Sequence, residues 1–345
     1  MQLISHDLGV DLGTSNVRIY VDGKGVIARE PSVVAVDKNT GKILQVGAAA
    51  RNMLGRTPGN VVAMSPLKDG VISDHEMTVK MLQILFRSVS KSSLFTPKPR
   101  VIVSVPSSIT EVEERTVINA AIEAGARRVY LIEAPLAAAL GANLDIKGPN
   151  GHMVVDVGGG TCNVAVLSMN GVAVSSSIPI GGIAFDETIA RYVRRNYGVI
   201  IGETTAEEVK IQIGSVYPRQ EDPTIAIRGR DAKNGTPREL TLTSSEVFNV
   251  LQRPARMITD EVLSVLEDTT PELVADIAEN GITLTGGGSL IWGMDMLLTE
   301  RTGIRCTLAD DPESCVAYGC GKSLGWINHM NEGPINIARK RILRR

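Results

Sequence analysis

Short runs of alternating and continuous apolar residues dominate two stretches of the chain, residues 8–36 and 153–178. In the first stretch LGVDLG, VRIYV, GVIA and SVVAV are separated by turn residues, and in the second MVVDVG, VAVLSM and VAVSSSI follow one another in the same way. β-Branched residues with a period of two favour strands. The dipeptides Asp22-Gly23 and Asn170-Gly171 predict hairpin turns between them.

Helical periodicity follows the first group of strands. Residues 75–91 are amphipathic, and a helix at 110–125 should begin with a capping box of Thr110 and Glu113. Gly125 ends that helix, and Pro135 opens the next one. The short apolar strands RVIVSVP and VYLI lie between these helices. Strands that alternate with helices indicate an α/β fold.

The second group of strands is also followed by helices. They are predicted at 185–197, 205–215, 244–268 and 315–327. Pro254 is expected to kink or divide the third of them, because proline removes a helical hydrogen bond. A strand, GITLTGGG, precedes the last helix and ends in a glycine triplet at 286–288.

The opening of the second stretch repeats the opening of the first. VDLGTSNVRIY and VDVGGGTCNVAVL share Val, Asp, Gly, Thr, Asn and Val once two glycines are removed from the second. This alignment places Asp11 opposite Asp156, 145 residues later, and Thr14 opposite Thr161. A domain-sized period that occurs twice excludes a solenoid. The pattern predicts one fold that has been duplicated.

Composition limits the function classes. The chain has 345 residues and a net charge of −2, which suits two domains or one bilobed unit and gives no reason to expect a nucleic-acid partner. Four scattered cysteines without CxxC spacing, and four separated histidines, fit no common zinc pattern and predict reduced thiols in a cytosolic protein. The N-terminus does not resemble a signal peptide. We expect a cytoplasmic protein, or one peripheral to the membrane.

Glycine-rich turns after strands expose backbone N–H groups, which bind phosphate oxygens. One such turn alone is more often only a tight turn, but two Asp-x-Gly turns and a third glycine triplet indicate a phosphate clamp. A carboxylate repels phosphate, so Asp11 and Asp156 require a cation such as Mg²⁺ between them. The chain has no Walker GxxxxGK[ST] motif and no GxGxxG after a strand.

At these residues the chain resembles the actin, sugar kinase and heat-shock chaperone superfamily. VDLGTSN, VDVGGGT and LTGGGS match its phosphate-1, phosphate-2 and adenosine motifs. REPSVVAVD, VPSSITEVEERTVINAAIEAGAR, AEEVKIQIGS, IRGRD and GITLTGGGSLIWGMD are similar to the MreB/Mbl family of rod shape-determining bacterial actins. The likeness runs from about residue 7 to residue 326. It implies an α/β, duplicated ribonuclease-H-like fold, with two lobes in four subdomains around a nucleotide cleft.

The resemblance also implies where the subdomains and the ligands lie. The expected subdomains are IA at 1–32 and 66–145, IB at 33–65, IIA at 146–180 and 246–330, and IIB at 181–245, followed by a basic tail at 331–345. ATP or ADP would be bound with Mg²⁺, and Asp11 and Asp156 would hold the metal through water. The nucleotide-binding residues would be Thr14, Ser15, Asn16, Gly158, Gly159, Gly160, Gly182, Glu207, Glu208, Lys210, Gly286, Gly287, Gly288 and Ser289. Without the resemblance, a surface ion pair is the preferred explanation of Glu207 and Lys210, which share one helix face.

Slow ATP hydrolysis coupled to polymerisation is implied in the same way. Glu133 matches the acid that positions the attacking water in this family, and Thr161 is a candidate second polar contact. Four residues depart from the family pattern and put the hydrolysis rate or the ribose contact in question: Ala134, Cys162, Asn163 and Ile183.

The expected partners follow from the family rather than from a motif. They are further copies of the chain in head-to-tail filaments, in paired protofilaments, and the cell-wall elongation machinery. Leu94 and Phe95 stand in a polar loop with basic neighbours, where the family inserts an apolar loop into an anionic membrane. Packing of the two residues onto their own lobe is the alternative. The basic tail, 339–345, fits a solvated segment or a lipid contact.

Three alternatives share the fold. A small-molecule kinase would need a base aimed at a substrate hydroxyl, and no separate candidate is evident in the sequence. A peptide chaperone should continue into a substrate-binding domain, which this sequence does not contain. A plasmid-segregating actin has weaker motif support.

Overall fold

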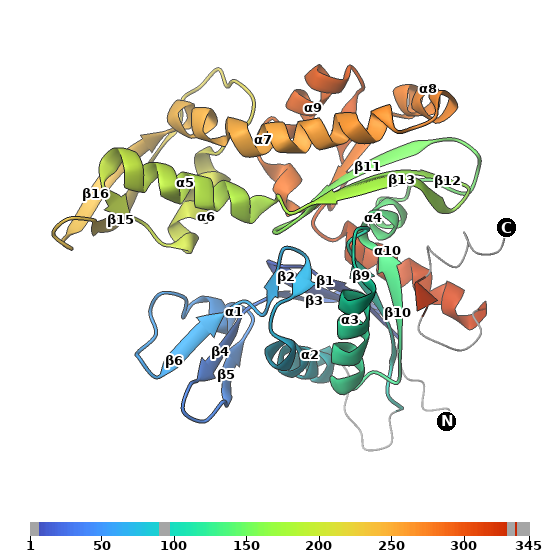
Figure 1. Ribbon diagram of the computed structural model, residues 1–345, viewed down its shortest axis with the longest axis horizontal. Helices are drawn as coiled ribbons and strands as arrows, with labels where there is room; N and C mark the ends of the chain where they lie inside the picture. The colour runs from blue at the N-terminus through green and yellow to red at the C-terminus, as the bar shows by residue number, and fades with distance from the viewer. Residues whose placement is uncertain (1–6, 90–96, 330–334, 337–345) are drawn as a thin grey trace.

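The computed structural model describes residues 7–89, 97–329 and 335–336. They form two lobes, one above the other in Figure 1, and each lobe is built on one large mixed sheet. The first-lobe sheet has the strand order β19-β10-β9-β1-β2-β3. Its strands are β1 (Leu8–Leu12), β2 (Asn16–Val21), β3 (Gly25–Pro31), β9 (Arg100–Val105), β10 (Arg128–Glu133) and β19 (Ile335–Asn336).

The second-lobe sheet repeats this arrangement in the order β13-β12-β11-β17-β18. Its strands are β11 (His152–Val157), β12 (Cys162–Ser168), β13 (Gly171–Ile178), β17 (Ile282–Thr285) and β18 (Cys306–Leu308). β1 is antiparallel to β2 and parallel to β9, just as β11 is antiparallel to β12 and parallel to β17. The predicted duplication and the α/β class are confirmed.

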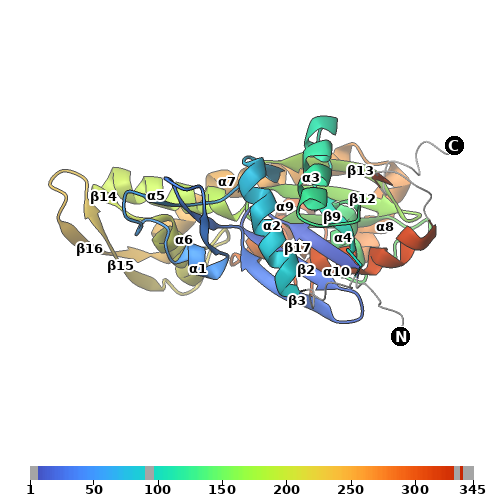
Figure 2. The same cartoon turned by 90° about the horizontal axis from the view of Figure 1, so that it is seen from below.

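A smaller sheet extends each lobe at the same end of the molecule (Figures 1 and 2). In the first lobe it comprises β4 (Val34–Asp37), β5 (Ile43–Val46) and β6 (Val61–Met64), beside α1 (Ala48–Arg51). In the second lobe it comprises β14 (Val199–Ile200), β15 (Thr224–Asp231) and β16 (Pro237–Thr243), beside α5 (Gly182–Tyr197) and α6 (Glu203–Ile213). A short hairpin, β7 (Leu67–Lys68) and β8 (Val71–Ile72), returns the first lobe to its main sheet.

Local sequence signals explain the helix boundaries. α2 (His75–Val89) and α3 (Glu111–Glu123) pack against one another in the first lobe. The Thr110 side chain accepts from the Glu113 N–H, and Glu113 bonds back to Thr110, so the predicted capping box of α3 is present. The second lobe also contains α8 (Pro271–Asn280), the 3₁₀ turn η1 (Gly287–Leu290) and α9 (Met294–Thr302).

The long helix α7 (Ser244–Glu267) is continuous, so of the two effects expected from Pro254 the division of the helix is wrong, and a kink stays a prediction. Pro254 is itself buried, and Leu251, Ala255 and Ile258 on the same face belong to the second-lobe core. Burial of this face outweighs one missing helical hydrogen bond. No helix among residues 7–89 and 97–329 is long and apolar enough to cross a membrane.

A hairpin turn also differs from its prediction. The β12–β13 hairpin forms where Asn170-Gly171 predicted it, but its left-handed residues are Met169 and Asn170, with φ of 51° and 57°. Gly171 already pairs with Ser168 as the first residue of β13. Two consecutive left-handed residues match the twist of a two-residue hairpin loop.

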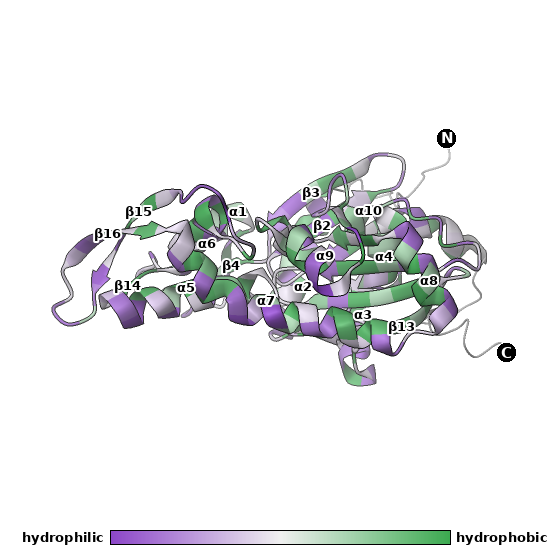
Figure 3. Cartoon of the chain, turned by 90° about the horizontal axis from the view of Figure 1, so that it is seen from above, coloured by the Kyte–Doolittle hydropathy of each residue, from purple (hydrophilic) through white to green (hydrophobic). Residues whose placement is uncertain are grey.

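Two helices join the lobes. α4 (Ala134–Gly141) follows a first-lobe strand but also packs on β11 and β12, and α10 (Cys315–Ser323) follows a second-lobe strand but packs on β1, β2 and β9. With the 3₁₀ segment η2 (Leu324–His329), they build a core between the lobes from residues of both sheets. Figure 1 places α4 and α10 between the lobes, and Figure 3 shows that α4 is almost wholly hydrophobic.

Candidate functional site

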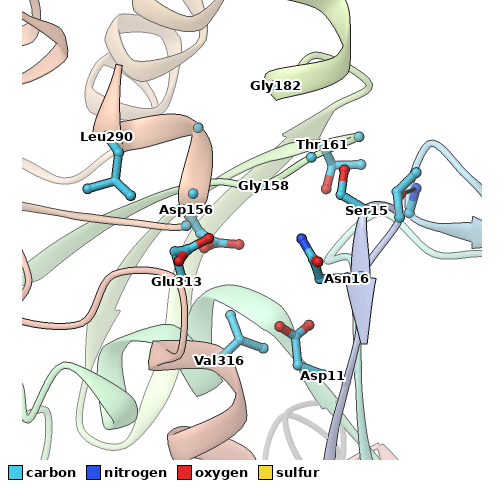
Figure 4. A pocket seen from close by; sticks show the side chains of 18 of the residues that line it. Asp11, Ser15, Asn16, Asp156, Gly158, Thr161, Gly182, Leu290, Glu313 and Val316 are labelled. Atoms are coloured by element: carbon cyan, nitrogen blue, oxygen red, sulfur yellow. Dashed lines mark hydrogen bonds between the residues drawn. The ribbon is translucent and has the colours of Figure 1, made fainter. Parts of the chain in front are cut away.

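A cavity of about 540 Å³ lies between the lobes, within the range of small-molecule sites. Its walls come from the turns after β1 and β11, the start of α5, one side of α6, the segment after β17 and the start of α10. In Figure 4, Asp11 and Asn16 lie across the cavity from Asp156 and Glu313. Both halves of the duplicated fold therefore contribute to one site.

Two glycine turns line the cavity, the first turn (residues 13–16, the last of which also begins β2) and the second turn (residues 158–161). Each has four residues between the last paired positions of its strands. Asp11 pairs with Arg18 across the first turn, and Asp156 pairs with Asn163 across the second. The partners are seven residues apart in both pairs (18 − 11 and 163 − 156). The hairpins therefore repeat at a constant offset of 145 residues.

The alignment made from the sequence, in which two glycines were removed, is therefore wrong for the turn residues. At the constant offset, Thr14 corresponds to Gly159 and Asn16 corresponds to Thr161. The pairing of the strands through their backbones fixes the register of each hairpin. The sequence alignment instead superposed identical residues. The duplication has kept the path of the chain and changed the residues along it.

The two turns approach each other so closely that the second must lack side chains. A Cβ on Gly159 would lie 2.0 Å from the Ser15 Oγ, and a Cβ on Gly160 would lie 2.5 Å from the Thr14 Oγ1. The Thr14 hydroxyl oxygen accepts a hydrogen bond of 2.9 Å from the Gly70 N–H, which fixes its position. The side chains of the first turn fill the space that side chains of the second would need.

Hydrogen bonds engage the carbonyl oxygens of both turns. Ser32 donates its hydroxyl (2.6 Å) and its N–H (2.9 Å) to carbonyl oxygens of the first turn. The first two residues of α5 donate their N–H groups to carbonyl oxygens of the second turn, both at 2.9 Å. These hydrogen bonds direct the carbonyl oxygens away from a bound anion and reduce their repulsion of it. The turns are therefore better suited to bind phosphate.

Asp11 and Asp156 are both buried at the cavity, and burial raises the pKa of each carboxyl group. The pKa of Asp11 is raised to about 6, with the Arg18 charge acting in the opposite direction. The Asp11 side chain is 14% exposed, lies 3.8 Å from the Arg18 Nη1 and accepts from Ser104 at 3.3 Å. Asp156 accepts instead from two neutral groups, the Thr285 hydroxyl at 2.9 Å and the Asn163 amide at 3.3 Å.

These carboxylates fit the magnesium ion that the fold family implies. Figure 4 shows both side chains directed toward the same space, beside the glycine turns. Mg²⁺ in nucleotide sites commonly takes one or two carboxylates together with phosphate oxygens and several waters. The two ionised groups, each buried, would be stabilised by such a cation.

Most of the residues implied by the family line the cavity: Asp11, Thr14, Ser15, Asn16, Asp156, Gly158, Gly159, Gly160, Thr161, Gly182, Glu207, Lys210, Gly286, Gly287 and Gly288. Three described residues of that set, Glu133, Glu208 and Ser289, do not line it. Glu208 is exposed on α6, and the buried Ser289 hydroxyl donates to the Thr285 carbonyl oxygen at 2.6 Å. Glu133 is the buried N-cap residue of α4, next to Ala134 in the cavity wall.

Two of the residues that depart from the family pattern are buried beside Asp156. Asn163 is 2% exposed, donates to Asp156 and to the Thr161 hydroxyl (3.4 Å), and accepts from Ser177 at 2.8 Å. Cys162 is fully buried, and burial raises the pKa of its thiol. Asn163 therefore connects the second turn to the carboxylate, whereas Cys162 serves packing.

A carboxylate at the α5 end of the cavity was not among the residues predicted from the sequence. Ile183 occupies the position after the glycines, but Asp186, one helical turn later, lines the cavity. The Lys210 ammonium donates to Asp186 at 2.8 Å and to the Gly182 carbonyl oxygen at 3.1 Å. The spacing of Gly182 and Asp186, four residues on one helix, could have revealed this position.

Other cavity residues gave no local signal. The Arg219 guanidinium stacks 4.7 Å from the centre of the Trp292 ring, and both line the cavity. Arg18 bonds Glu313, 295 residues away. Arg51 of α1 forms an ion pair with Glu207, a cavity residue of α6, and so connects the helices beside the two small sheets. Leu94, Phe95 and residues 339–345 of the basic tail lie outside the described residues, whereas Ile335–Asn336 of the expected tail form β19 of the first-lobe sheet.

The chain is similar to proteins of known family. The family model described as MreB/Mbl protein matches residues 5–332. The cell shape-determining protein MreB of Escherichia coli (strain K12) is 51% identical over 337 residues, which cover 96% of this chain and 97% of that protein.

Solved structures agree with the sequence comparison. MreB5 of Spiroplasma citri bound to AMPPNP superposes with a TM-score of 0.89 at 38% identity, over 94% of this chain and 97% of that one. The MamK double helical filament gives a TM-score of 0.77 at 21% identity, over 95% of this chain and 99% of that one, which shows the fold alone.

Proposed function

Since this chain belongs to the MreB/Mbl family, we propose that it is a nucleotide-binding, actin-like filament protein that determines rod cell shape. The protein would bind ATP or ADP in the cavity between its lobes and assemble with further copies of itself. The relatives named as cell shape-determining proteins, and a structural relative solved with a nucleotide analogue, support this.

The facing pair of glycine turns carries the proposal. Both turns line one cavity, their carbonyl oxygens are engaged elsewhere, and their side-chain pattern is complementary. Backbone N–H groups of the two turns would bind the phosphates from two sides. Asp11 and Asp156 would hold Mg²⁺ through its waters, and the ion would supply charge neutralisation for the phosphates.

The other end of the cavity would receive the nucleoside. Glu207, Lys210 and the backbone of 286–288 line that end, so they remain candidates for it. Ser289 would act through the backbone of its turn, since its hydroxyl is bonded internally. Glu208 is exposed on the far side of the helix and is the weakest member of the set.

Slow hydrolysis is part of the proposal. Glu133 would orient the attacking water, and the Thr161 hydroxyl would assist it. Glu133 begins α4 beside the cavity wall, and the Asn163 amide donates to the Thr161 hydroxyl. Because that hydrogen bond uses one lone pair of the Thr161 oxygen and restrains the hydroxyl, Asn163 would slow the reaction.

Membrane attachment and filament geometry extend the proposal. Leu94 and Phe95 would insert into an anionic membrane surface, and paired head-to-tail protofilaments would add avidity to this weak contact. The filament would lie on the inner face of the cytoplasmic membrane and organise the cell-wall elongation machinery. We also propose the family's subdomain division, with IB around β4–β6 and IIB around β14–β16.

Sedimentation and electron microscopy test the proposal. The full chain is incubated with ATP and Mg²⁺, with and without anionic liposomes, and compared with a nucleotide-free sample. Nucleotide-dependent filaments, bound to the liposomes, are expected. A monomer that transfers phosphate to a sugar would instead identify a small-molecule kinase. Liposome binding by a Leu94→Ser/Phe95→Ser variant at the wild-type level would remove the membrane loop from the proposal.

A further inference from the structure

Arg18 is a buried cation at the phosphate end of the cavity. It lies on β2, directly opposite Asp11 on β1, and its side chain is 12% exposed. Its Nη2 donates to the Glu313 carboxylate at 3.0 Å, and its Nη1 lies 3.8 Å from the Asp11 carboxylate. All three residues line the cavity.

The Arg18 guanidinium has more N–H groups than it uses in hydrogen bonds within the described residues. It carries five N–H groups, and one of its nitrogens, Nη2, makes a hydrogen bond to an acceptor within residues 7–89 and 97–329. Its Nε is buried without an acceptor in the same part of the chain. At the equivalent position of the second hairpin, Asn163 is neutral and engages Asp156, Thr161 and Ser177. Arg18 is held in place but is not saturated by the protein.

The surroundings of Arg18 are strongly anionic. Asp11, Asp156 and Glu313 are directed toward one space, and the Arg18 charge favours the ionised form of both aspartates. The other cation–carboxylate pair of the cavity noted above, Lys210 with Asp186, lies where α6 meets the start of α5. A nucleotide would add further negative charge between the carboxylates. Guanidinium binds phosphate oxygens with two parallel hydrogen bonds.

We propose that Arg18 is a phosphate-binding residue of this site, which exchanges its contacts with Glu313 and Asp11 for phosphate oxygens when a nucleotide enters. The inference rests on the proposed nucleotide function. It means that part of the affinity for the nucleotide comes from a cation built into the chain and does not depend on Mg²⁺. A purely structural role, as an ion pair that ties β2 to the loop before α10, is the competing explanation.

Nucleotide binding measured with and without magnesium distinguishes the phosphate-binding role of Arg18 from the structural role. ATP, ADP and adenosine are titrated by calorimetry into the full chain and into Arg18→Met, once with Mg²⁺ and once with EDTA. In EDTA, Arg18→Met should bind ADP and ATP about ten- to a hundredfold more weakly than the wild type, the size of a charge-assisted hydrogen bond. With Mg²⁺ the difference should shrink. Adenosine, which has no phosphate, should bind both proteins equally.

Two further variants serve as controls. Arg29 is the neighbour of Arg18 across β2 and β3, and it bonds Asp311 in the same loop at 3.1 Å, but it does not line the cavity. Arg29→Met should leave nucleotide binding unchanged. Arg18→Lys, which keeps the charge and loses the fork, should fall between the wild type and Arg18→Met. It also keeps the test valid if Arg18→Met does not fold.

The outcomes are distinct. Equal losses in Arg18→Met and Arg29→Met, or an equal loss of adenosine binding, would overturn the phosphate role in favour of the structural one. An Arg18→Met variant with wild-type affinity in EDTA would do the same. A wild-type chain that binds no nucleotide even with Mg²⁺ would refute the proposed function itself.

Discussion

The two glycine hairpins are equal in backbone and opposite in chemistry. Each has a four-residue turn and a carboxylate whose cross-strand partner is seven residues away. The first turn presents side chains, whereas the second is almost bare backbone. The carboxylate of the first hairpin, Asp11, lies opposite the cation Arg18, and the carboxylate of the second, Asp156, lies opposite the neutral amide of Asn163. A duplicated fold whose copies face each other cannot keep the same side chains on both, because they would occupy the same space.

The largest effect should come from adding a side chain to the bare turn. In Gly159→Ala, the new Cβ would lie 2.0 Å from the Ser15 Oγ and 2.6 Å from its Cβ, so the turns must separate. We expect nucleotide affinity to fall about a hundredfold, as for the loss of one or two charge-assisted hydrogen bonds to phosphate. The double variant Ser15→Gly/Gly159→Ala moves the side chain to the other turn and should recover much of the loss. If the double variant binds no better than the single one in the same titration, steric complementarity does not explain the asymmetry.

Neutralising Asp11, the carboxylate of the first hairpin, should have the next largest effect, which is on stability. The folded protein holds the Asp11 proton more tightly than the unfolded chain, so stability is lost as pH rises from about 4 to about 6. Asp11→Asn should therefore stabilise the nucleotide-free protein at pH 7 by up to about 3 kcal/mol, and the gain should vanish near pH 4. Urea unfolding at both pH values measures this. Asp156→Asn should act in the same direction, and a loss of stability at pH 7 in both variants would contradict the burial argument.

A smaller effect is expected from the neutral partner of the second hairpin. Asn163→Ala removes one of the two buried hydrogen bonds of Asp156 and the partly buried bond of Ser177, which should cost about 1–3 kcal/mol in the free energy of unfolding. Ser177→Ala, which removes one of these bonds, is the matched control and should cost less. Chemical denaturation of the two variants in parallel decides the point. Equal stability of Asn163→Ala and the wild type would mean that the hydrogen bonds of Asn163 do not contribute to stability.

The smallest effect concerns the far side of the cavity, away from both hairpins. Arg51 and Glu207 are about one-third exposed, so their ion pair should contribute no more than about 1 kcal/mol to stability. Arg51→Met should nonetheless release nucleotide several-fold faster, because the pair connects the lobes beside the proposed nucleoside end. Stopped-flow displacement of a fluorescent nucleotide measures the rate. In a double-mutant cycle with Glu207→Gln, additive effects would exclude coupling between the two.

Local sequence signals predicted most of the elements. The capping box at Thr110 and Glu113 and the hairpins follow from residues that are close together in the sequence, and the duplication follows from two similar motifs 145 residues apart. The register of the turns did not follow, because identical letters in Thr14 and Thr161 suggested an equivalence that strand pairing does not allow. The low helix propensity of proline likewise predicted a break at Pro254, but the packing of α7 against the second-lobe core outweighs it.

The site was predictable where it consists of glycine turns and of residues that match a family motif. The glycine turns and both aspartates were recognised in the sequence and line one cavity. Arg18 with Glu313, Arg51 with Glu207, and Arg219 with Trp292 could not be recognised, since each pair brings distant segments together. Ser289 illustrates the converse, because a polar residue beside a glycine triplet can bond its own backbone instead of facing the cavity.

The contact between α4 and α10 has a mechanical consequence. Gly141 and Gly319 let the two helices touch backbone to backbone, since a Cβ at either position would lie under 2 Å from a carbonyl oxygen of the other helix. The chain passes from one lobe to the other through these same two helices, so their contact acts as a pivot. A small rotation about it would move the nearby glycine turns little but would displace β6 and β15, which lie farthest from α4 and α10, by a greater distance (Figure 1).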